Sequence, residues 1–221
     1  MKSPVSYIDH TLLTSTASAD DITLLCEEAV EYCFAAVCIP PVYVRQASDL
    51  LYGSEVAVAT VVGFPLGYEA ASVKSFQTQR AIAAGATEID MVIHLGAAQA
   101  GDLASVEKDI SAVVAAAEAT PVKVIIECCL FNDAMKVSLA ETVIRAGAAY
   151  VKTSTGFAAT GATLADVGLL AKTVAGKVGV KAAGGIRDWE TCRQMIEAGA
   201  TRIGTSAGVE IAREWLAAES K

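Results

Sequence analysis

The chain has 221 residues, of which 53% are hydrophobic and 19% are charged, so it can bury enough apolar surface to fold and is not a disordered protein. Lysine and arginine number 17 against 25 aspartates and glutamates, a formal net charge of -8, which is the wrong sign for neutralising a nucleic-acid backbone. Uncharged runs such as 32–44 and 56–68 are shorter than the roughly 20 apolar residues of a membrane helix. We therefore expect a soluble protein that binds neither nucleic acid nor membranes.

Short β-branched segments alternate along the chain with longer alanine-rich segments that carry charges, the pattern of alternating strands and helices. The expected strands are 6–10, 35–39, 56–62, 87–92, 122–127, 149–152, 179–182 and 201–204. The expected helices, one after each strand, are 18–32, 41–52, 70–84, 102–118, 133–146, 162–175, 188–198 and 206–218. This alternation predicts an α/β fold, a closed (β/α)8 TIM barrel. No Pro/Gly/Ser-rich linker divides the chain, so we expect one domain over residues 1–221.

The first residues up to Asp9 lack the apolar core of a secretory signal, so we expect a cytoplasmic protein. The cysteines form no Cys-x-x-Cys pair and several lie among aliphatic residues, which indicates reduced and mostly buried thiols. They are Cys26, Cys33, Cys38, Cys128, Cys129 and Cys192.

The motif Ala-Gly-Ala precedes three of the expected strands, and each of its glycines fits a helix C-cap. Five residues after these glycines stand Asp90, Lys152 and Gly204, where we expect the strands to end at the catalytic rim of a barrel. The motif is also a common helix-to-strand turn, so a true internal repeat and a shared turn chemistry both remain open. The three motifs are 84–86, 146–148 and 198–200.

Strand alternation directs three ionisable side chains into the barrel. Lys181 and Asp90 each lie between apolar neighbours in an expected strand, and Lys152 alternates with Ala149 and Val151, so all three side chains point inward. Two lysines on adjacent strands need a carboxylate, a bound anion or a lowered pKa. A lysine whose pKa is lowered by a second ammonium can attack a carbonyl and form a Schiff base, with Asp90 moving protons. The alternative is a Lys-Asp-Lys ion network that only fills the barrel end.

Glycine-bearing turns follow the seventh and eighth expected strands, at 181–187 and 202–208. In barrels these two loops commonly bind phosphate, because glycine lets backbone N–H groups approach the anion and a helix N-terminus follows. The alternative for each turn taken alone is an ordinary tight turn. The candidates are Gly184, Gly185, Gly204 and Ser206.

Other polar residues give weaker signals. The only histidines, His10 and His94, lack metal-ligand spacing, so we expect no metal and no other cofactor. His10 fits a structural hydrogen bond better than a base. At the expected end of the first strand, Asp9 either pairs with a rim lysine or caps a helix. Cys38 is a buried thiol or lines the mouth, and Glu127 is a weaker acid candidate or a loop salt bridge.

Six segments spread over nearly the whole chain carry a family resemblance. They are Ile-Asp-His-Thr-Leu-Leu at 8–13, Val-Cys-Ile-Pro at 37–40, Val-Gly-Phe-Pro-Leu-Gly at 62–67, Glu-Ile-Asp-Met-Val at 88–92, Tyr-Val-Lys-Thr-Ser-Thr-Gly-Phe at 150–157 and Val-Lys-Ala-Ala-Gly-Gly-Ile-Arg at 180–187. In these segments the chain closely resembles the deoxyribose-phosphate aldolases, metal-free carbon-carbon lyases of deoxynucleoside breakdown. The resemblance implies that Lys152 forms the Schiff base, Asp90 gives and takes protons, and Lys181 tunes Lys152.

The implied reaction is reversible cleavage of 2-deoxy-D-ribose 5-phosphate to D-glyceraldehyde 3-phosphate and acetaldehyde. The substrates are thus a phosphorylated sugar and an aldehyde, and so hydrophobic a chain predicts a homo-oligomer, a dimer or larger. Asp9 is an accessory residue. Residues expected to bind the phosphate are Gly156, Gly184, Gly185, Gly204, Thr205 and Ser206.

Three departures from the family pattern affect the expected phosphate affinity and proton transfer. Phe157 stands where some members have a lysine, Ala207 follows Ser206 where relatives continue with serine, and the end at 219–221 lacks the tyrosine of longer relatives. Two other functions remain open: another Schiff-base sugar-phosphate enzyme of the transaldolase kind, or a silent phosphosugar-binding barrel. Acetaldehyde turnover distinguishes these readings.

Overall fold

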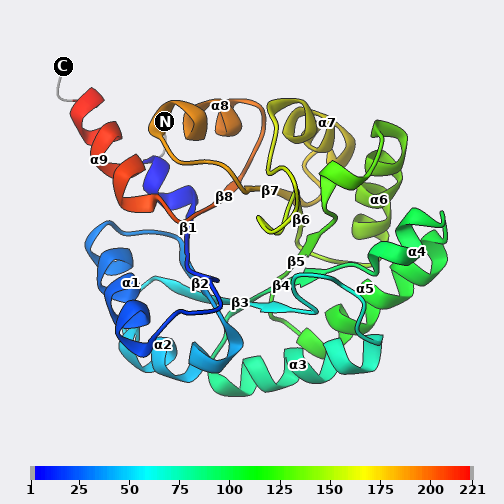
Figure 1. Cartoon of the computed structure of the whole chain (residues 1–221), viewed down its shortest axis with the longest axis horizontal. Helices are drawn as coiled ribbons and strands as arrows, with labels where there is room; N and C mark the ends of the chain where they lie inside the picture. The colour runs from blue at the N-terminus through cyan, green and yellow to red at the C-terminus, as the bar shows by residue number, and fades with distance from the viewer. Residues whose placement is uncertain (1–2, 220–221) are drawn as a thin grey trace.

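The computed structural model describes residues 3–219, in which eight parallel strands pair in chain order and close into a barrel (Figure 1). The last strand pairs with the first, as Asp9 lies opposite Gly204. The strands are β1 (Ile8–Thr11), β2 (Ala36–Ile39), β3 (Ala57–Val62), β4 (Glu88–Val92), β5 (Val122–Ile125), β6 (Tyr150–Lys152), β7 (Gly179–Ala183) and β8 (Arg202–Thr205). The predicted TIM barrel is confirmed.

The helices form an outer ring around the barrel (Figure 1). They are α1 (Ala19–Glu31), α2 (Val44–Leu50), α3 (Ala71–Ala84), α4 (Leu95–Gln99), α5 (Leu103–Ala117), α6 (Asp133–Arg145), α7 (Leu164–Val174), α8 (Trp189–Glu197) and α9 (Gly208–Glu219). Short 3₁₀ helices are η1 (Pro4–Tyr7), η2 (Pro41–Tyr43) and η3 (Cys128–Leu130).

Strand alternation separates two environments. Ile89, Val151 and Ile203 are fully buried in the large apolar core that the helices share with the barrel wall. Their sequence neighbours Asp90 and Lys152 are also buried but belong to a polar interior, because successive strand side chains point to opposite faces. The barrel interior can therefore concentrate charge without weakening the outer core.

The Ala-Gly-Ala motifs end helices as expected. Gly85, Gly147 and Gly199 have φ values of 111°, 79° and 113°, the left-handed conformation that glycine adopts without steric cost. At Gly85 a Cβ atom would also lie 2.2 Å from the Ser48 hydroxyl oxygen, so the close approach of α2 to this turn requires glycine.

Several predicted boundaries are wrong. The strand expected at 122–127 ends at Ile125, because Glu127 turns into the left-handed region at φ 53°. Likewise, Asp90 lies in the middle of β4 rather than at its end. The helix expected at 41–52 is divided into η2 and α2.

Other elements were missed or shifted. Helix α4 was not predicted; it begins where the His94 side chain accepts a hydrogen bond from Ala97 N–H at 2.9 Å. The first strand was expected to begin at residue 6 but begins at Ile8, because η1 occupies Pro4–Tyr7. The helix expected at 206–218 begins at Gly208 and extends to Glu219.

All six cysteines are free thiols, and four of them are buried, as predicted. Burial raises the pKa of Cys192 to about 12 and that of Cys26 to about 11. Within residues 3–219, no helix has the length and apolar character that crossing a membrane requires. Of the C-terminal segment discussed above, residues 220–221 lie outside the described part of the chain.

Candidate active site

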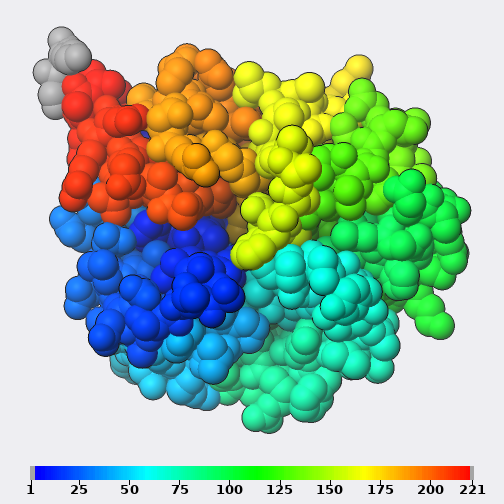
Figure 2. Space-filling view, viewed as in Figure 1, coloured from blue at the N-terminus to red at the C-terminus, as the bar shows by residue number. Residues whose placement is uncertain are grey.

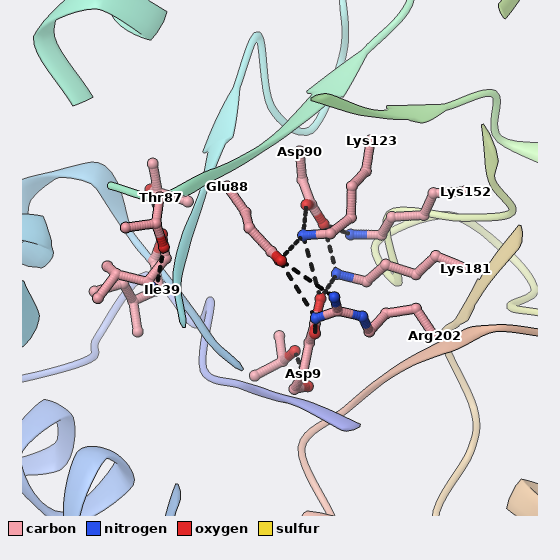
Figure 3. A network of polar contacts seen from close by, with 12 residues as sticks. Asp9, Ile39, Thr87, Glu88, Asp90, Lys123, Lys152, Lys181 and Arg202 are labelled. Carbon is pink, nitrogen blue, oxygen red and sulfur yellow. Dashed lines mark hydrogen bonds and ion pairs between the residues drawn. The ribbon is translucent and has the colours of Figure 1, made fainter. Parts of the chain in front are cut away.

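Three of the predicted residues meet inside the barrel. The Lys152 ammonium at the end of β6 and the Lys181 ammonium on β7 both lie 2.7 Å from the same oxygen, Oδ2 of Asp90 on β4 (Figure 3). Their two nitrogens are therefore no farther apart than twice that distance. Lys152 and Lys181 are register partners of adjacent strands, and this pairing places one ammonium beside the other.

Asp9 completes this arrangement from β1. Its carboxylate accepts hydrogen bonds from Lys181 and, at 2.7 Å, from Arg202 on β8, and it lies 3.4 Å from the Lys123 ammonium. The side chain is fully buried. Of the two alternatives considered for Asp9, pairing with a lysine is therefore the one present, although Asp9 is the second residue of β1 and not its end.

Seven charged side chains form one buried network, here called the ion cluster (Figure 3). Its members are Asp9, Glu88, Asp90, Lys123, Lys152, Lys181 and Arg202. They come from six of the eight strands, all except β2 and β3. Buried charges are stabilised in folded proteins by contact with opposite charges, and each of the seven contacts at least one.

Lys152 is the least neutralised cation of the ion cluster. It contacts one carboxylate, whereas Lys181 and Arg202 each contact two and Lys123 contacts three. Burial lowers the pKa of Lys152 below its ordinary value and the neighbouring Lys181 lowers it further, against the opposing effect of Asp90. This environment favours the neutral amine, which is the nucleophilic form.

Lys181 and Asp90 in the ion cluster stay ionised. Burial acts to lower the pKa of Lys181, but Asp9 and Asp90 raise it above its ordinary value. Burial likewise opposes ionisation of Asp90, yet Lys123, Lys152 and Lys181 hold its pKa well below the usual range. The cluster thus combines a lysine of lowered pKa with a carboxylate and an ammonium that are both ionised at rest.

A cavity of about 240 Å³ opens beside Lys152. It is lined on one side by the loops after β7 and β8. Of the seven cluster members, all of which lie within residues 3–219, only Lys152 lines it. All six residues expected to bind phosphate also line it, and Arg187 adds a cation that was not among the residues expected there. These six are Gly156, Gly184, Gly185, Gly204, Thr205 and Ser206.

The loop between β6 and α7 covers part of this opening. In the space-filling view this yellow segment lies across the middle of the visible face (Figure 2). Phe157 on this loop packs edge-on against Phe64 of the β3–α3 loop, with ring centroids 5.3 Å apart. Ala162 N–H donates to the carbonyl oxygens of Ala183 and Gly184, which ties the loop to the β7–α8 loop.

Glu127, two residues after the end of β5, fixes the same β6–α7 loop. Its carboxylate accepts a hydrogen bond from the Thr155 hydroxyl at 2.5 Å and another from Thr155 N–H at 3.2 Å, while Phe157 N–H donates to the Thr155 oxygen at 3.0 Å. Of the two alternatives left open for Glu127, the loop salt bridge is therefore wrong, because the partners of this carboxylate are neutral donors.

Two further candidates have structural surroundings. The buried His10 contacts Glu28 through Nε2 at 2.7 Å, which fits the expected structural hydrogen bond. Cys38 is fully buried on β2, where desolvation raises the pKa of its thiol. Within residues 3–219 no group of three His, Cys, Asp or Glu side chains is arranged to hold a metal ion.

A family model described as DeoC/LacD family aldolase matches residues 5–217. The chain belongs to the DeoC/LacD aldolase family. A protein named deoxyribose-phosphate aldolase from Syntrophotalea carbinolica is 56% identical over 215 residues, 97% of each chain. A protein of the same name from Brevibacillus brevis is 53% identical over 205 residues, 93% of each chain.

A solved DeoC/LacD-type structure has the same architecture. The tetrameric deoxyribose phosphate aldolase from Aeropyrum pernix superposes with a TM-score of 0.91 at 36% identity, over 97% of this chain and 92% of that one. The family resemblance read from the sequence is confirmed, since both the family model and these relatives span nearly the whole chain.

In this DeoC/LacD aldolase, sequence reasoning missed three members of the ion cluster. Lys123 and Arg202 each lie between apolar or outward-facing neighbours on β5 and β8 and point inward by the same alternation that identified Lys181. Glu88 lies two residues before Asp90 and therefore shares its face. The signal was present in all three segments.

Proposed function

We propose that this chain catalyses the reversible cleavage of 2-deoxy-D-ribose 5-phosphate to D-glyceraldehyde 3-phosphate and acetaldehyde, through a Schiff base on Lys152. One observation carries the proposal: a buried lysine with a lowered pKa faces a cavity and touches a carboxylate that it shares with a second lysine. The names of the similar proteins support the same reaction.

The covalent steps follow from a neutral Lys152 amine. Its nitrogen adds to the C1 aldehyde carbon of the open-chain sugar, and the resulting carbinolamine loses water to give an iminium. The C3 hydroxyl then loses its proton and the C2–C3 bond breaks, with its electrons passing into the iminium to form an enamine. Glyceraldehyde 3-phosphate leaves, C2 takes up a proton, and water releases acetaldehyde and the free amine.

Asp90 and Lys181 move the protons in this scheme. Asp90 already touches both lysine nitrogens at 2.7 Å. In this scheme Asp90 accepts the proton that leaves Lys152, and Lys181 donates a proton toward the carbinolamine oxygen, which leaves as water. Lys181 keeps its charge because Asp9 and Asp90 raise its pKa. Its positive charge in turn disfavours a second ammonium at Lys152.

The loops after β6, β7 and β8 bind the phosphate in this proposal. Gly156, Gly184 and Gly185 have φ values of 85°, 89° and 82°, a backbone that exposes N–H groups to an anion, and α9 begins at Gly208, shortly after β8 ends at Thr205. Anchoring the phosphate here holds the C1 end of the sugar near Lys152, which lowers the entropic part of the barrier.

Reductive trapping tests the proposal. Acetaldehyde followed by borohydride should add an ethyl group to Lys152, detected by peptide mass spectrometry, and aldol cleavage should fall at least about a thousandfold in Lys152→Arg, whose guanidinium stays protonated. The exposed Lys172 on α7 provides a matched control in Lys172→Arg, which should retain both adduct and turnover. A folded wild-type enzyme that forms no adduct would leave a silent phosphosugar-binding barrel, and turnover only with a ketone donor would indicate a transaldolase-like enzyme.

We also infer that the enzyme is a cytoplasmic homo-oligomer. The Aeropyrum pernix relative is described as tetrameric, and large apolar side chains such as Val42, Tyr52 and Phe76 are 78%, 93% and 62% exposed in the single chain. Buried free thiols fit a reducing compartment. Light scattering coupled to gel filtration measures the assembly, and a monomeric mass at micromolar concentration would contradict it.

A further inference from the structure

The ion cluster extends from the substrate cavity to the opposite end of the barrel. Lys152 is the last residue of β6, whereas Glu88 and Arg202 are the first residues of β4 and β8. Direct contacts connect the two ends: Glu88 lies 2.5 Å from the Lys123 ammonium, Lys123 lies 2.9 Å from Asp90, and Asp90 lies 2.7 Å from Lys152 (Figure 3).

A second line of contacts runs through Arg202. Its guanidinium donates to Asp9 at 2.7 Å and to Glu88 at 3.1 Å, and Asp9 in turn pairs with Lys181. The guanidinium also lies over the Tyr150 ring, 5.7 Å from the centroid. Gly179 makes room for that ring, since a Cβ atom there would lie 2.3 Å from it.

Glu88 and Arg202 have no place in the substrate cavity. Neither lines it, and Arg202 instead borders a separate opening at the amino end of the barrel together with Tyr7 and Tyr150. Their side chains are 11% and 13% exposed there, whereas Asp9 and Asp90 are fully buried. Any influence of Glu88 and Arg202 on Lys152 therefore passes through the other members of the ion cluster.

The numbers of positive and negative groups in the ion cluster indicate how Glu88 and Arg202 affect Lys152. The cluster contains four cationic side chains but only three carboxylates, so with every group ionised it carries one uncompensated buried positive charge. Lys152 is the cation with the fewest carboxylate contacts, and the groups facing it are Asp90 from β4, Lys181 from β7 and Cys38 from β2. Neutral Lys152 balances the cluster.

We propose that Glu88 and Arg202 are positioning residues that set the charge state of Lys152 from the far end of the barrel, through Lys123, Asp9 and Asp90. The inference rests on the proposed function of Lys152 as the nucleophile. Removing the Glu88 carboxylate makes the surroundings of Lys152 more positive and disfavours its ammonium. Removing the Arg202 guanidinium makes them more negative and favours it.

Competitive acetylation measures the pKa of Lys152 without requiring turnover. The rate at which acetic anhydride labels Lys152 is followed by peptide mass spectrometry as a function of pH, because only the neutral amine reacts. We expect the midpoint to move by about half a pH unit or more, down in Glu88→Gln and up in Arg202→Met. The double variant has the same one-charge imbalance as the wild type and should return close to the wild-type midpoint.

Control variants separate charge from shape. Arg202→Lys keeps the cation and should leave the midpoint within experimental error of the wild type. Glu107→Gln and Arg145→Met make the same chemical changes at an exposed pair between α5 and α6, 2.9 Å apart, and should not shift it. Circular dichroism and thermal unfolding confirm that each variant is folded, and if Arg202→Met is not, the direction of the Glu88→Gln shift decides.

Opposite shifts in the two single variants support the inference, since general loosening of the barrel would move both midpoints in one direction. Equal-signed shifts, or no shift in folded Glu88→Gln, overturn it. The labelling result is independent of the aldolase assay: loss of the proposed function would be seen as absent turnover and absent trapping, whatever the labelling midpoints are.

Discussion

Lys152 shows how a residue acquires its chemistry from its immediate neighbours. An ordinary lysine is almost entirely protonated near neutral pH, but Lys152 is 3% exposed and touches one carboxylate, which a second lysine shares. Burial and Lys181 lower its pKa, while Lys181 keeps its own proton because two carboxylates raise its pKa. Similar lysines thus have pKa values shifted in opposite directions, and they differ in the number of carboxylates around each.

Replacing Lys181 by methionine tests this difference. Lys181→Met removes the neighbouring ammonium but leaves Asp90 in contact with Lys152, so the pKa of Lys152 should rise. We expect the pH at which acetaldehyde trapping on Lys152 reaches half its maximal rate to move upward by about one unit. The exposed Lys172 provides the control, Lys172→Met. A downward or absent shift would mean that Lys181 does not tune Lys152.

Side-chain direction in a strand was readable from the sequence alone. Alternation placed Lys152, Lys181 and Asp90 inside the barrel, and the structure has them in contact. The same rule applies to Lys123 and Arg202, but it does not predict which charged residue of another strand each of them contacts. Only the barrel closure brings β4, β5 and β8 around one point.

At the scale of elements, the β6–α7 loop depends on a carboxylate from another strand. Glu127 leaves the ladder of β5 with φ 53° and accepts two hydrogen bonds from Thr155. Thr155 then accepts from Phe157 N–H, which packs the Phe157 ring on Phe64. The strand was predicted to continue to residue 127. It ends at Ile125 because the hydrogen bonds of Glu127 to Thr155, here called the Glu127 clamp, need a turn where the alternation predicted an extended backbone.

Glu127→Gln tests the clamp. The amide is neutral and has one acceptor oxygen in place of two, so the hydrogen bonds from Thr155 lose their charge assistance and the β6–α7 loop shifts. We expect KM for 2-deoxyribose 5-phosphate to rise about tenfold, the size of one lost charge-assisted hydrogen bond, while acetaldehyde trapping on Lys152 changes less than twofold. Steady-state kinetics and trapping rates measure both quantities.

The exposed Glu55 supplies the matched control for this clamp. Glu55→Gln should leave both quantities unchanged. Equal losses in phosphate-dependent KM and trapping in Glu127→Gln would mean that Glu127 acts on the nucleophile instead of the loop.

For the whole molecule, the ion cluster joins six strands through buried contacts and makes stability depend on pH. Burial opposes ionisation of Asp9, but Lys123, Lys181 and Arg202 hold its pKa below the ordinary value. A carboxylate whose folded pKa is depressed stabilises the fold fully above its unfolded pKa of about 3.9 and loses that contribution as pH falls through the folded pKa. Acid should therefore lower the free energy of unfolding by protonating a buried carboxylate of the ion cluster.

We expect the wild-type Tm to be nearly constant between about pH 5 and pH 7 and to fall below about pH 4. Asp9→Asn removes one partner from a buried network and should lower the free energy of unfolding at pH 7 by about 3 kcal/mol, with a shallower fall in acid. Differential scanning calorimetry across this range measures both effects. The exposed Asp49 gives the control Asp49→Asn, and an equally steep acid slope in Asp9→Asn would contradict the assignment.

The sequence by itself determined the (β/α)8 barrel, the family, and the inward direction of Lys152, Lys181 and Asp90, because hydrophobic periodicity and strand alternation are local properties of the chain. Tertiary structure alone decided which charges pair, how many carboxylates each lysine contacts, and how Glu127 holds a loop 28 residues away. Those features depend on closing eight strands into one barrel, where residues distant in sequence share a low-dielectric interior.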